Sequence, residues 1–167
     1  LLTISLKTYA IIPVKSFSKA KTRLNIPQIK RELLCKEMLE EVLKTLSKCK
    51  SIDNIVIVSK DDAAIKLGKS FGAMQIFDDE LGVNQAVHLA DQYLSDLECS
   101  CSVIFPQDIP MMESSDIDNL LGFLKSKNSV ILVPSRQFNG TNALVRYYAS
   151  SMKTQYDKGS YSHQINA

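Results

Sequence analysis

The feature that most constrains the fold is the alternation of short apolar runs with longer amphipathic stretches. The runs are rich in β-branched residues and have the length of buried strands; they span residues 9–14, 54–59, 74–77, 102–106, 130–134 and 142–147. Helices are expected at 28–49, for about ten residues up to Gly72, from 82 to about 96, and after Ser114 or Ser115 as the N-cap. This alternation predicts an α/β protein whose mainly parallel sheet is covered by helices on both faces.

Length and composition fit one globular domain. The chain has 167 residues, of which 45% are hydrophobic and 23% charged, so a single domain over 1–167 with its own core is expected. There is no apolar run near 18 residues and no signal-peptide pattern at the start, which indicates a cytoplasmic protein without a membrane segment. The four cysteines lack the spacing of a zinc site, and we expect reduced thiols.

Charge is distributed unevenly along the chain. The formal net charge is only +2, which does not favour a nucleic-acid partner. Residues 1–50 nevertheless contain 11 Lys and Arg against 4 Asp and Glu, and the remainder contains 9 against 14. A positive region confined to one end suits a compact anionic ligand such as a polyphosphate.

The cationic residues gather in the loop directly after the first expected strand. This loop, 15–23, contains Lys15, Lys19, Lys21 and Arg23. In an open α/β sheet, ligands bind outside the carboxyl ends of the strands. Two interpretations are open, namely a basic surface loop and a binding site for an anion. The sequence has neither a P-loop nor a Gly-x-Gly-x-x-Gly motif, so cationic side chains would have to bind any phosphates.

Asp108 follows the expected strand at 102–106 and lies between Pro106 and Pro110. An aspartate in this position commonly forms a turn. It can also bind Mg2+, which proteins usually hold through one or two carboxylates together with substrate phosphates. The cationic loop elsewhere in the chain favours the second interpretation, a combined metal and phosphate site.

Six segments, in this order along the chain, resemble the 2-phospho-L-lactate guanylyltransferase family: Pro13-Val14-Lys15, Ala20-Lys21-x-Arg23-Leu24, Gly82-Val83-Asn84-Gln85-Ala86, Pro106-Gln107-Asp108-Ile109-Pro110, Gly140-Thr141-Asn142-Ala143-Leu144 and Gly159-Ser160-Tyr161. That family makes a precursor of the deazaflavin coenzyme F-420, and it belongs to the glycosyltransferase-A-like nucleotidyltransferases. The resemblance implies a three-layer α/β/α fold with a mainly parallel, mixed central sheet.

The resemblance also implies a reaction and a set of site residues. GTP and a three-carbon phospho-acid, either 2-phospho-L-lactate or phosphoenolpyruvate, would give a guanylylated diphosphate and pyrophosphate with Mg2+ as cofactor. The implied roles are catalysis for Lys15, Lys21, Arg23 and Asp108; nucleotide binding for Pro13, Lys21, Arg23, Asn84 and Asp108; acceptor binding for Lys15, Thr141, Gly159 and Ser160; and metal binding for Asp108. A cytoplasmic homodimer from an archaeal methanogen is the expected context.

The chain departs from the family pattern in two places. The family usually continues for a further acidic segment of the Asp-x-Asp-Thr-Pro type, which the domain over 1–167 is expected to lack. The family often has a histidine where this chain has Gln164, and His163 stands one residue early. The alternatives are a nucleotidyltransferase of the molybdenum-cofactor or sugar-phosphate type, and a GTP-binding protein without catalytic activity.

Overall fold

A computed structural model describes residues 7–167, which form a six-stranded sheet in the order β3-β2-β1-β4-β6-β5. The strands are β1 (Thr8–Pro13), β2 (Asn54–Val58), β3 (Met74–Ile76), β4 (Cys101–Ile104), β5 (Val130–Pro134) and β6 (Thr141–Arg146). The helices are α1 (Gln28–Leu46), α2 (Asp62–Ser70), α3 (Val83–Ser95), α4 (Ser114–Gly122) and α5 (Ser160–Ile165), with short 3-10 turns η1 (Phe17–Lys19) and η2 (Ala149–Ser151).

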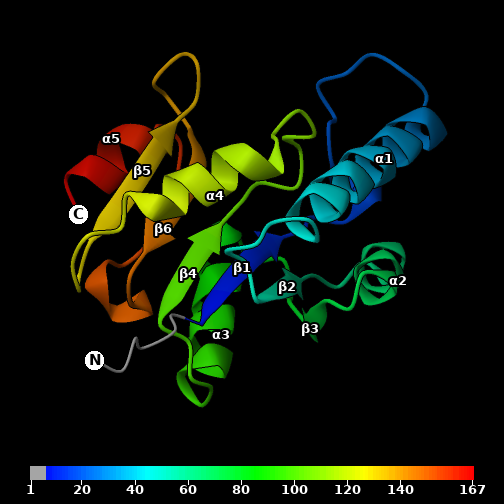
Figure 1. Cartoon of the computed structure of the whole chain (residues 1–167). Coiled ribbons are helices and arrows are strands. Elements are labelled where there is room, and N and C mark those ends of the chain that lie inside the picture. Colours follow the sequence, from blue (N-terminus) through cyan, green and yellow to red (C-terminus); the bar gives the residue numbers. More distant parts are fainter. Residues whose placement is uncertain (1–6) are drawn as a thin grey trace.

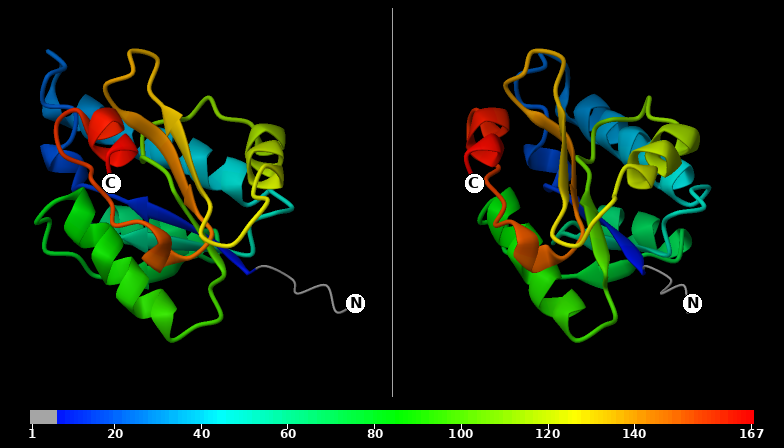
Figure 2. Two further views of the ribbon diagram at one scale, coloured as in Figure 1. Left: turned by 90° about the vertical axis from the view of Figure 1, so that its left-hand side faces the viewer. Right: turned by 60° about the vertical axis from the view of Figure 1, so that its left-hand side comes forward.

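The sheet is the middle layer of three (Figures 1 and 2). The helices α1, α2 and α4 cover one face, where the core includes Ile12 of β1, Leu39 of α1 and Ile117 of α4. The helix α3 covers the other face, where Ile11 of β1 packs with Ala90 of α3. Successive residues of β1 therefore enter opposite cores, as the pleat requires. The predicted three-layer fold is confirmed.

The strand β1 lies at the centre and pairs in parallel with β2 on one side and with β4 on the other. The strand β3 extends the parallel region, whereas β6 runs antiparallel to both β4 and β5. The sheet is thus mixed, as expected. Because β6 is reversed, its first residue, Thr141, lies at the same edge of the sheet as the carboxyl ends of β1, β3 and β4.

One expected helix start is wrong. The N-cap of α4 is Glu113, and Ser114 and Ser115 lie inside the helix. Within α4, Asp118 accepts hydrogen bonds from the backbone N–H groups of Lys50 and Ser51. This contact joins α4 to the segment after α1. Within residues 7–167, no helix has the length and apolar character that crossing a membrane requires.

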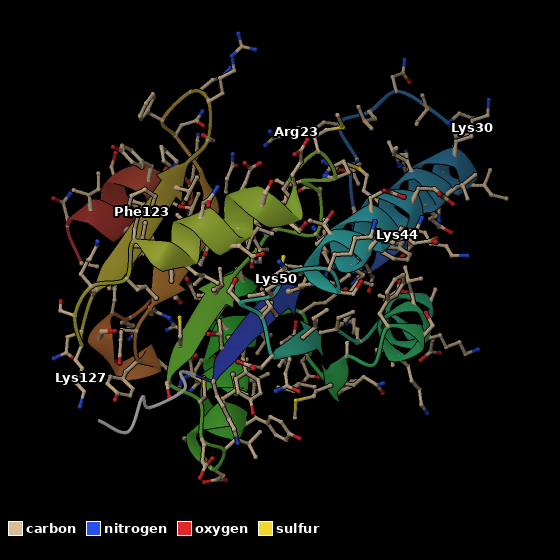
Figure 3. All side chains as sticks on the ribbon, viewed as in Figure 1. Arg23, Lys30, Lys44, Lys50, Phe123 and Lys127 are labelled. Carbon is tan, nitrogen blue, oxygen red and sulfur yellow. The ribbon has the colours of Figure 1, made fainter. Side chains whose placement is uncertain are left out.

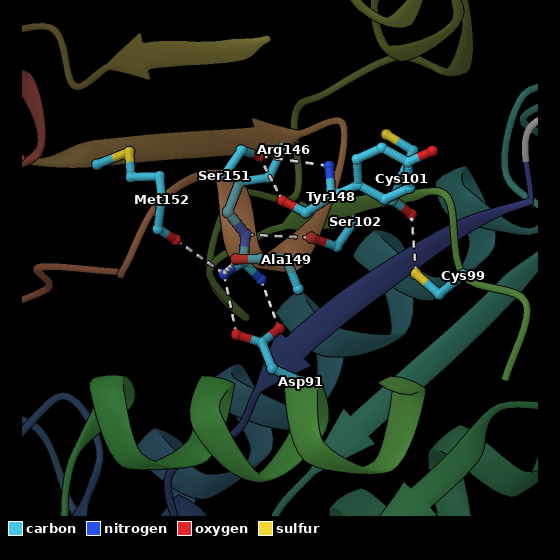
Figure 4. Close-up of polar contacts among 9 residues, drawn as sticks. All are labelled: Asp91, Cys99, Cys101, Ser102, Arg146, Tyr148, Ala149, Ser151 and Met152. Carbon is cyan, nitrogen blue, oxygen red and sulfur yellow. Dashed lines mark hydrogen bonds and ion pairs between the residues drawn. The ribbon is translucent and has the colours of Figure 1, made fainter. Parts of the chain in front are cut away.

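Arg146 at the end of β6 is fully buried and is the polar centre of the α3 face (Figure 4). Its guanidinium donates two hydrogen bonds to the Asp91 carboxylate of α3, at 2.9 and 2.6 Å, and one to the Ser102 hydroxyl of β4 at 3.1 Å. It also donates to the carbonyl oxygens of Ala149 and Met152, at 3.2 and 3.3 Å. A buried charge needs such complete pairing.

The Arg146 contacts fix the direction in which the chain leaves the sheet. The segment after β6 passes over η2 toward α3, where the Asn84 side-chain oxygen accepts a hydrogen bond from the backbone N–H of Tyr156 at 2.7 Å. Asn84 and Asp91 are seven residues apart in α3, so they share one face of that helix. One face of α3 therefore anchors the C-terminal part of the chain at two residues, Arg146 and Tyr156.

We expect Asp91→Ala to lower the free energy of unfolding by about 3 kcal/mol, because it leaves the Arg146 guanidinium buried without its ion partner. In an Arg146→Met background, Asp91→Ala should lower the free energy of unfolding by much less. Urea unfolding of the double-mutant cycle measures the coupling. Asp96→Ala, at the exposed end of the same helix, is the control and should change stability by less than about 0.5 kcal/mol. Additive effects of the two substitutions would contradict this account.

Candidate functional site

A cavity of about 770 Å³ lies at the edge of the sheet where β1, β3 and β4 end and β6 begins. Six of the residues that the sequence implicated line it: Pro13, Lys15, Lys21, Arg23, Asp108 and Thr141. Lys15 is exposed, and Arg23 lies on the exposed loop between β1 and α1 (Figure 3). The open sheet thus brings together residues from three separate stretches of the chain, as its topology predicts.

Lys21 and Asp108 form a close ion pair across this cavity, although 87 residues separate them. Their side chains are 29% and 37% exposed, so both remain accessible to a ligand. Lys21 has a φ of 53°, a left-handed conformation that is uncommon for a residue with a side chain. The loop conformation at this residue therefore directs a cation toward the only carboxylate that the sequence assigned to the site.

The three other residues that the sequence implicated, Asn84, Gly159 and Ser160, are not among the residues that line the cavity. The Ser160 hydroxyl is buried and hydrogen-bonds that of Thr141 at 2.9 Å, and Gly159 precedes it as the N-cap of α5 with a φ of 80°. Asn84 uses its side-chain oxygen on Tyr156, a lining residue. Ser160 and Asn84 thus each bond a residue that lines the cavity, and Gly159 adjoins Ser160.

Two carboxylates that the sequence did not assign to the site hold the cationic loop in place. Glu80 accepts from the backbone N–H of Ser16 at 2.6 Å and from the Lys19 ammonium at 3.0 Å. Asp61 accepts from the backbone N–H of Phe17 at 2.9 Å while it also caps α2. Burial would raise the pKa of Glu80, but the hydrogen bonds from Ser16 and Lys19 outweigh it and lower that pKa to about 2.

Three further lining residues each have a buried polar atom without a hydrogen-bond partner among the described residues. The atoms are Asp78 Oδ1, Gln107 Oε1 and the Tyr156 hydroxyl. Burial raises the pKa of the Asp78 carboxyl and of the Tyr156 phenol. Leaving such atoms unpaired costs about 1–3 kcal/mol each. Their presence in one cavity indicates a surface shaped for a polar ligand, and no short motif in the sequence signals it.

The donor set of the cavity suits a weakly held Mg2+ rather than a closed metal cage. Among residues 7–167 no group of three or more histidine, cysteine, aspartate or glutamate side chains could hold a metal ion. Mg2+ keeps several waters and commonly binds one or two carboxylates together with substrate phosphates. Asp108, which is partly exposed and paired with Lys21, fits that mode.

A second cavity, of about 580 Å³, adjoins Asp108 from the α4 face of the sheet. Its lining is mainly apolar, with Phe105, Ile109 and Val133 among its residues. It contains none of the cations of the cationic loop. The first cavity is therefore the better candidate for binding a phosphorylated ligand.

Comparison with known proteins agrees with this geometry. Residues 8–167 match the family described as "Guanylyl transferase CofC like". The chain is 30% identical to a phosphoenolpyruvate guanylyltransferase from Conexibacter woesei, over 90% of this chain and 70% of the relative. It is 32% identical to a 2-phospho-L-lactate guanylyltransferase from Methanothermobacter thermautotrophicus, over 96% and 71%. A 4-diphosphocytidyl-2C-methyl-D-erythritol synthase structure from Anaerococcus prevotii superposes with a TM-score of 0.61 at 12% identity, over 97% and 83%.

The low pKa of Glu80 makes its contribution to stability depend on pH. The folded-state pKa of about 2 lies below the ordinary value of 4.5, so the carboxylate stabilises the fold above about pH 4.5 and loses this effect as the pH falls toward 2. We expect the difference in unfolding free energy between the unchanged protein and Glu80→Gln to shrink as the pH is lowered from 7 to 3. Urea unfolding across this range measures it. Glu37→Gln, on the exposed surface of α1, is the control, and a difference for Glu80→Gln that is constant with pH would contradict the assignment.

Proposed function

The chain belongs to the CofC-like guanylyltransferase family, and from that premise we propose that it transfers GMP from GTP to a three-carbon phospho-acid with release of pyrophosphate. The product would be a guanylylated diphosphate on the route to coenzyme F-420. Relatives named for 2-phospho-L-lactate and for phosphoenolpyruvate match this chain over a similar extent, and these two compounds are the candidate acceptors.

The observation that carries this proposal is the cavity in which Lys15, Lys21, Arg23 and Asp108 meet. Two polyanions must be brought together there, and three cations offset the repulsion between them. Lys21 and Arg23 would bind the GTP phosphates and stabilise the leaving pyrophosphate. Lys15, at the end of the central strand β1, would lie between the nucleotide and the acceptor phosphate.

The reaction is a displacement at the α-phosphorus of GTP. An oxygen of the acceptor phosphate forms a new bond to that phosphorus, and the bond to the bridging oxygen of pyrophosphate breaks, so that pyrophosphate leaves with the electron pair. The attacking phosphate oxygen already carries negative charge and needs no strong general base. Positioning and charge neutralisation therefore supply most of the rate enhancement, which agrees with a site made of Lys, Arg and Asp.

Asp108 would hold Mg2+ beside the transferring group, and the metal when bound would neutralise charge on the phosphate oxygens. In the structure the Asp108 carboxylate is paired with Lys21. Binding of the metal and of the phosphates would give each member of this pair a new partner of opposite charge. Neither Asp108 nor Lys21 would then be left uncompensated.

The acceptor would bind where β6 begins, through Thr141, Ser160 and the backbone of Gly159. The buried hydroxyl pair of Thr141 and Ser160 has spare hydrogen-bonding capacity for a phosphate or carboxylate oxygen. Pro13 would contact the nucleoside from the end of β1. Since the side-chain oxygen of Asn84 is bonded to Tyr156, contact of Asn84 with the nucleotide would fall to its amide N–H group.

The proposal is tested by measuring pyrophosphate release from GTP with 2-phospho-L-lactate and with phosphoenolpyruvate, each with and without Mg2+. Release with one of these acids and Mg2+ supports it and identifies the acceptor. Release only with a sugar phosphate or a molybdopterin acceptor would show a different nucleotidyltransferase. Tight GTP binding without release from any pair would show a GTP-binding protein and would sink the enzymatic proposal.

We expect Asp108→Asn to lower turnover by at least about 100-fold, because it removes the charge that would hold the metal at the transferring phosphate. The fold should be retained, since the lost contact with Lys21 is a partly exposed pair worth at most about 1 kcal/mol. Pyrophosphate release and urea unfolding of the variant separate the two effects. Near-normal turnover would remove Asp108 from the metal-binding role.

We expect Lys21→Ala to raise the KM for GTP and to lower kcat, with a combined loss in kcat/KM of about 100-fold. Steady-state kinetics with each substrate varied in turn measures this. Lys44→Ala removes the same charge from the outer surface of α1 (Figure 3) and should leave both constants unchanged. A change in the acceptor KM alone would mean that the nucleotide and acceptor halves of the site have been exchanged.

A further inference from the structure

Asp78 is the most completely buried charged residue of the cavity. It lies two residues beyond β3, is 5% exposed, and lines the cavity that contains the cationic loop. Its Oδ1 atom is buried and has no hydrogen-bond partner among the described residues. The carboxylate of nearby Glu80 accepts hydrogen bonds from Ser16 and Lys19, so the two acids of this loop differ in their contacts. A buried carboxylate oxygen left free at a binding cavity indicates that a ligand supplies the donor.

The topology places Asp78 far from the phosphate-binding end of the cavity. The strand order β3-β2-β1-β4 puts three strand spacings between the carboxyl end of β3 and that of β4, where Asp108 lies. At about 4.8 Å for each spacing, the carboxyl ends of β3 and β4 stand about 14 Å apart across the sheet edge. Pro13, the last residue of β1, lies between them. One cavity spans both ends, so a nucleotide that lies along it with its phosphates near Lys21 and Asp108 would reach toward Asp78 with its base.

A carboxylate selects among bases by its hydrogen-bonding character. It accepts only. The Watson–Crick edge of guanine offers two adjacent donors, the N1–H and the 2-amino group. Adenine and cytosine each place a ring-nitrogen acceptor next to their amino group, and uracil flanks its single N–H with two carbonyl oxygens. Only guanine can donate two hydrogen bonds to one carboxylate without an acceptor facing it.

We propose that the carboxylate of Asp78 is the specificity-determining group for guanine, accepting hydrogen bonds from N1–H and from the 2-amino group of GTP. The inference rests on the proposed function, because that function supplies the nucleotide. The inference goes beyond that function because it names the residue and the atoms that distinguish GTP from other nucleoside triphosphates. Loss of a hydrogen-bonding partner from such a site is costly, because the buried carboxylate is then left unpaired.

The test is calorimetric titration of GTP, ITP, XTP and ATP, each with Mg2+, in the absence of an acceptor. We expect the unchanged protein to bind ITP, which lacks the 2-amino group, about 10-fold more weakly than GTP, and ATP at least about 100-fold more weakly. In Asp78→Asn the side chain presents one acceptor and one donor. Xanthine matches this pair, since it has N1–H beside a carbonyl oxygen, so GTP affinity should fall by about 100-fold while XTP affinity rises by about 10-fold.

The matched control is Asp79→Asn, which removes the same charge from the adjacent, exposed residue and should preserve the order of affinities. Weakening of all four nucleotides alike in Asp78→Asn, with no gain for XTP, would assign Asp78 to the ribose hydroxyls or to loop structure and would overturn the inference. An unchanged GTP affinity would also overturn it. Thermal unfolding of each variant confirms that the titrated protein is folded.

Failure of this inference can be told apart from failure of the proposed function. Binding is measured without an acceptor and does not require turnover. If the affinities follow the expected order but no pyrophosphate is released with either phospho-acid, the enzymatic proposal fails and guanine recognition by Asp78 stands. If pyrophosphate is released but Asp78→Asn shows no exchange of GTP for XTP, the function stands and this inference fails.

Discussion

The parallel pairing of β1 with both β2 and β4 is the constraint on which the site depends. Because β1 is buried on both faces and bonded on both edges, it cannot shift without breaking two ladders and two cores. Its cationic loop must therefore emerge at the same sheet edge as Asp108 after β4 and Asp78 after β3. The reversed strand β6 adds Thr141 to that edge. The cavity is thus a consequence of strand order rather than of any one contiguous motif.

A loop with four cations needs compensation before any ligand is bound, and the structure supplies it selectively. Glu80 is bonded to the backbone and to Lys19, and Asp61 is bonded to the backbone of Phe17, so both fix the loop. Lys21 pairs with Asp108, where both side chains remain partly exposed. Asp78 has a buried carboxylate oxygen that no group within residues 7–167 hydrogen-bonds. Glu80 and Asp61 thus hold the loop through its backbone, whereas Asp108 pairs with a loop side chain that remains accessible from the cavity.

The sequence predicts much of this fold, because buried strands and amphipathic helices have strong periodic signals. The strand positions, the mixed three-layer sheet and the family follow from it, as does the meeting of Lys15, Lys21, Arg23 and Asp108 at one edge. The contacts of Glu80 and Arg146 do not, because each depends on partners from distant segments. In the sequence Arg146 has the pattern of an ordinary strand residue, because its ion partner Asp91 lies 55 positions away. The predicted N-cap of α4 was wrong because it rested on the capping preference of serine, and the structure has Glu113 at that position.

The helix α3 links the two halves of the cavity. Its first residue, Val83, lines the cavity beside the loop that contains Asp78, so this end of the helix would adjoin the nucleotide in the proposed site. Along one face, Asn84 and Asp91 bind Tyr156 and Arg146, and these contacts hold the segment that leads to Ser160. In the proposed site, one rigid helix would thus set the distance between nucleotide and acceptor. Transfer that relies on positioning needs such a shared support, because a displacement of about 1 Å between the reacting groups can cost about 100-fold in rate.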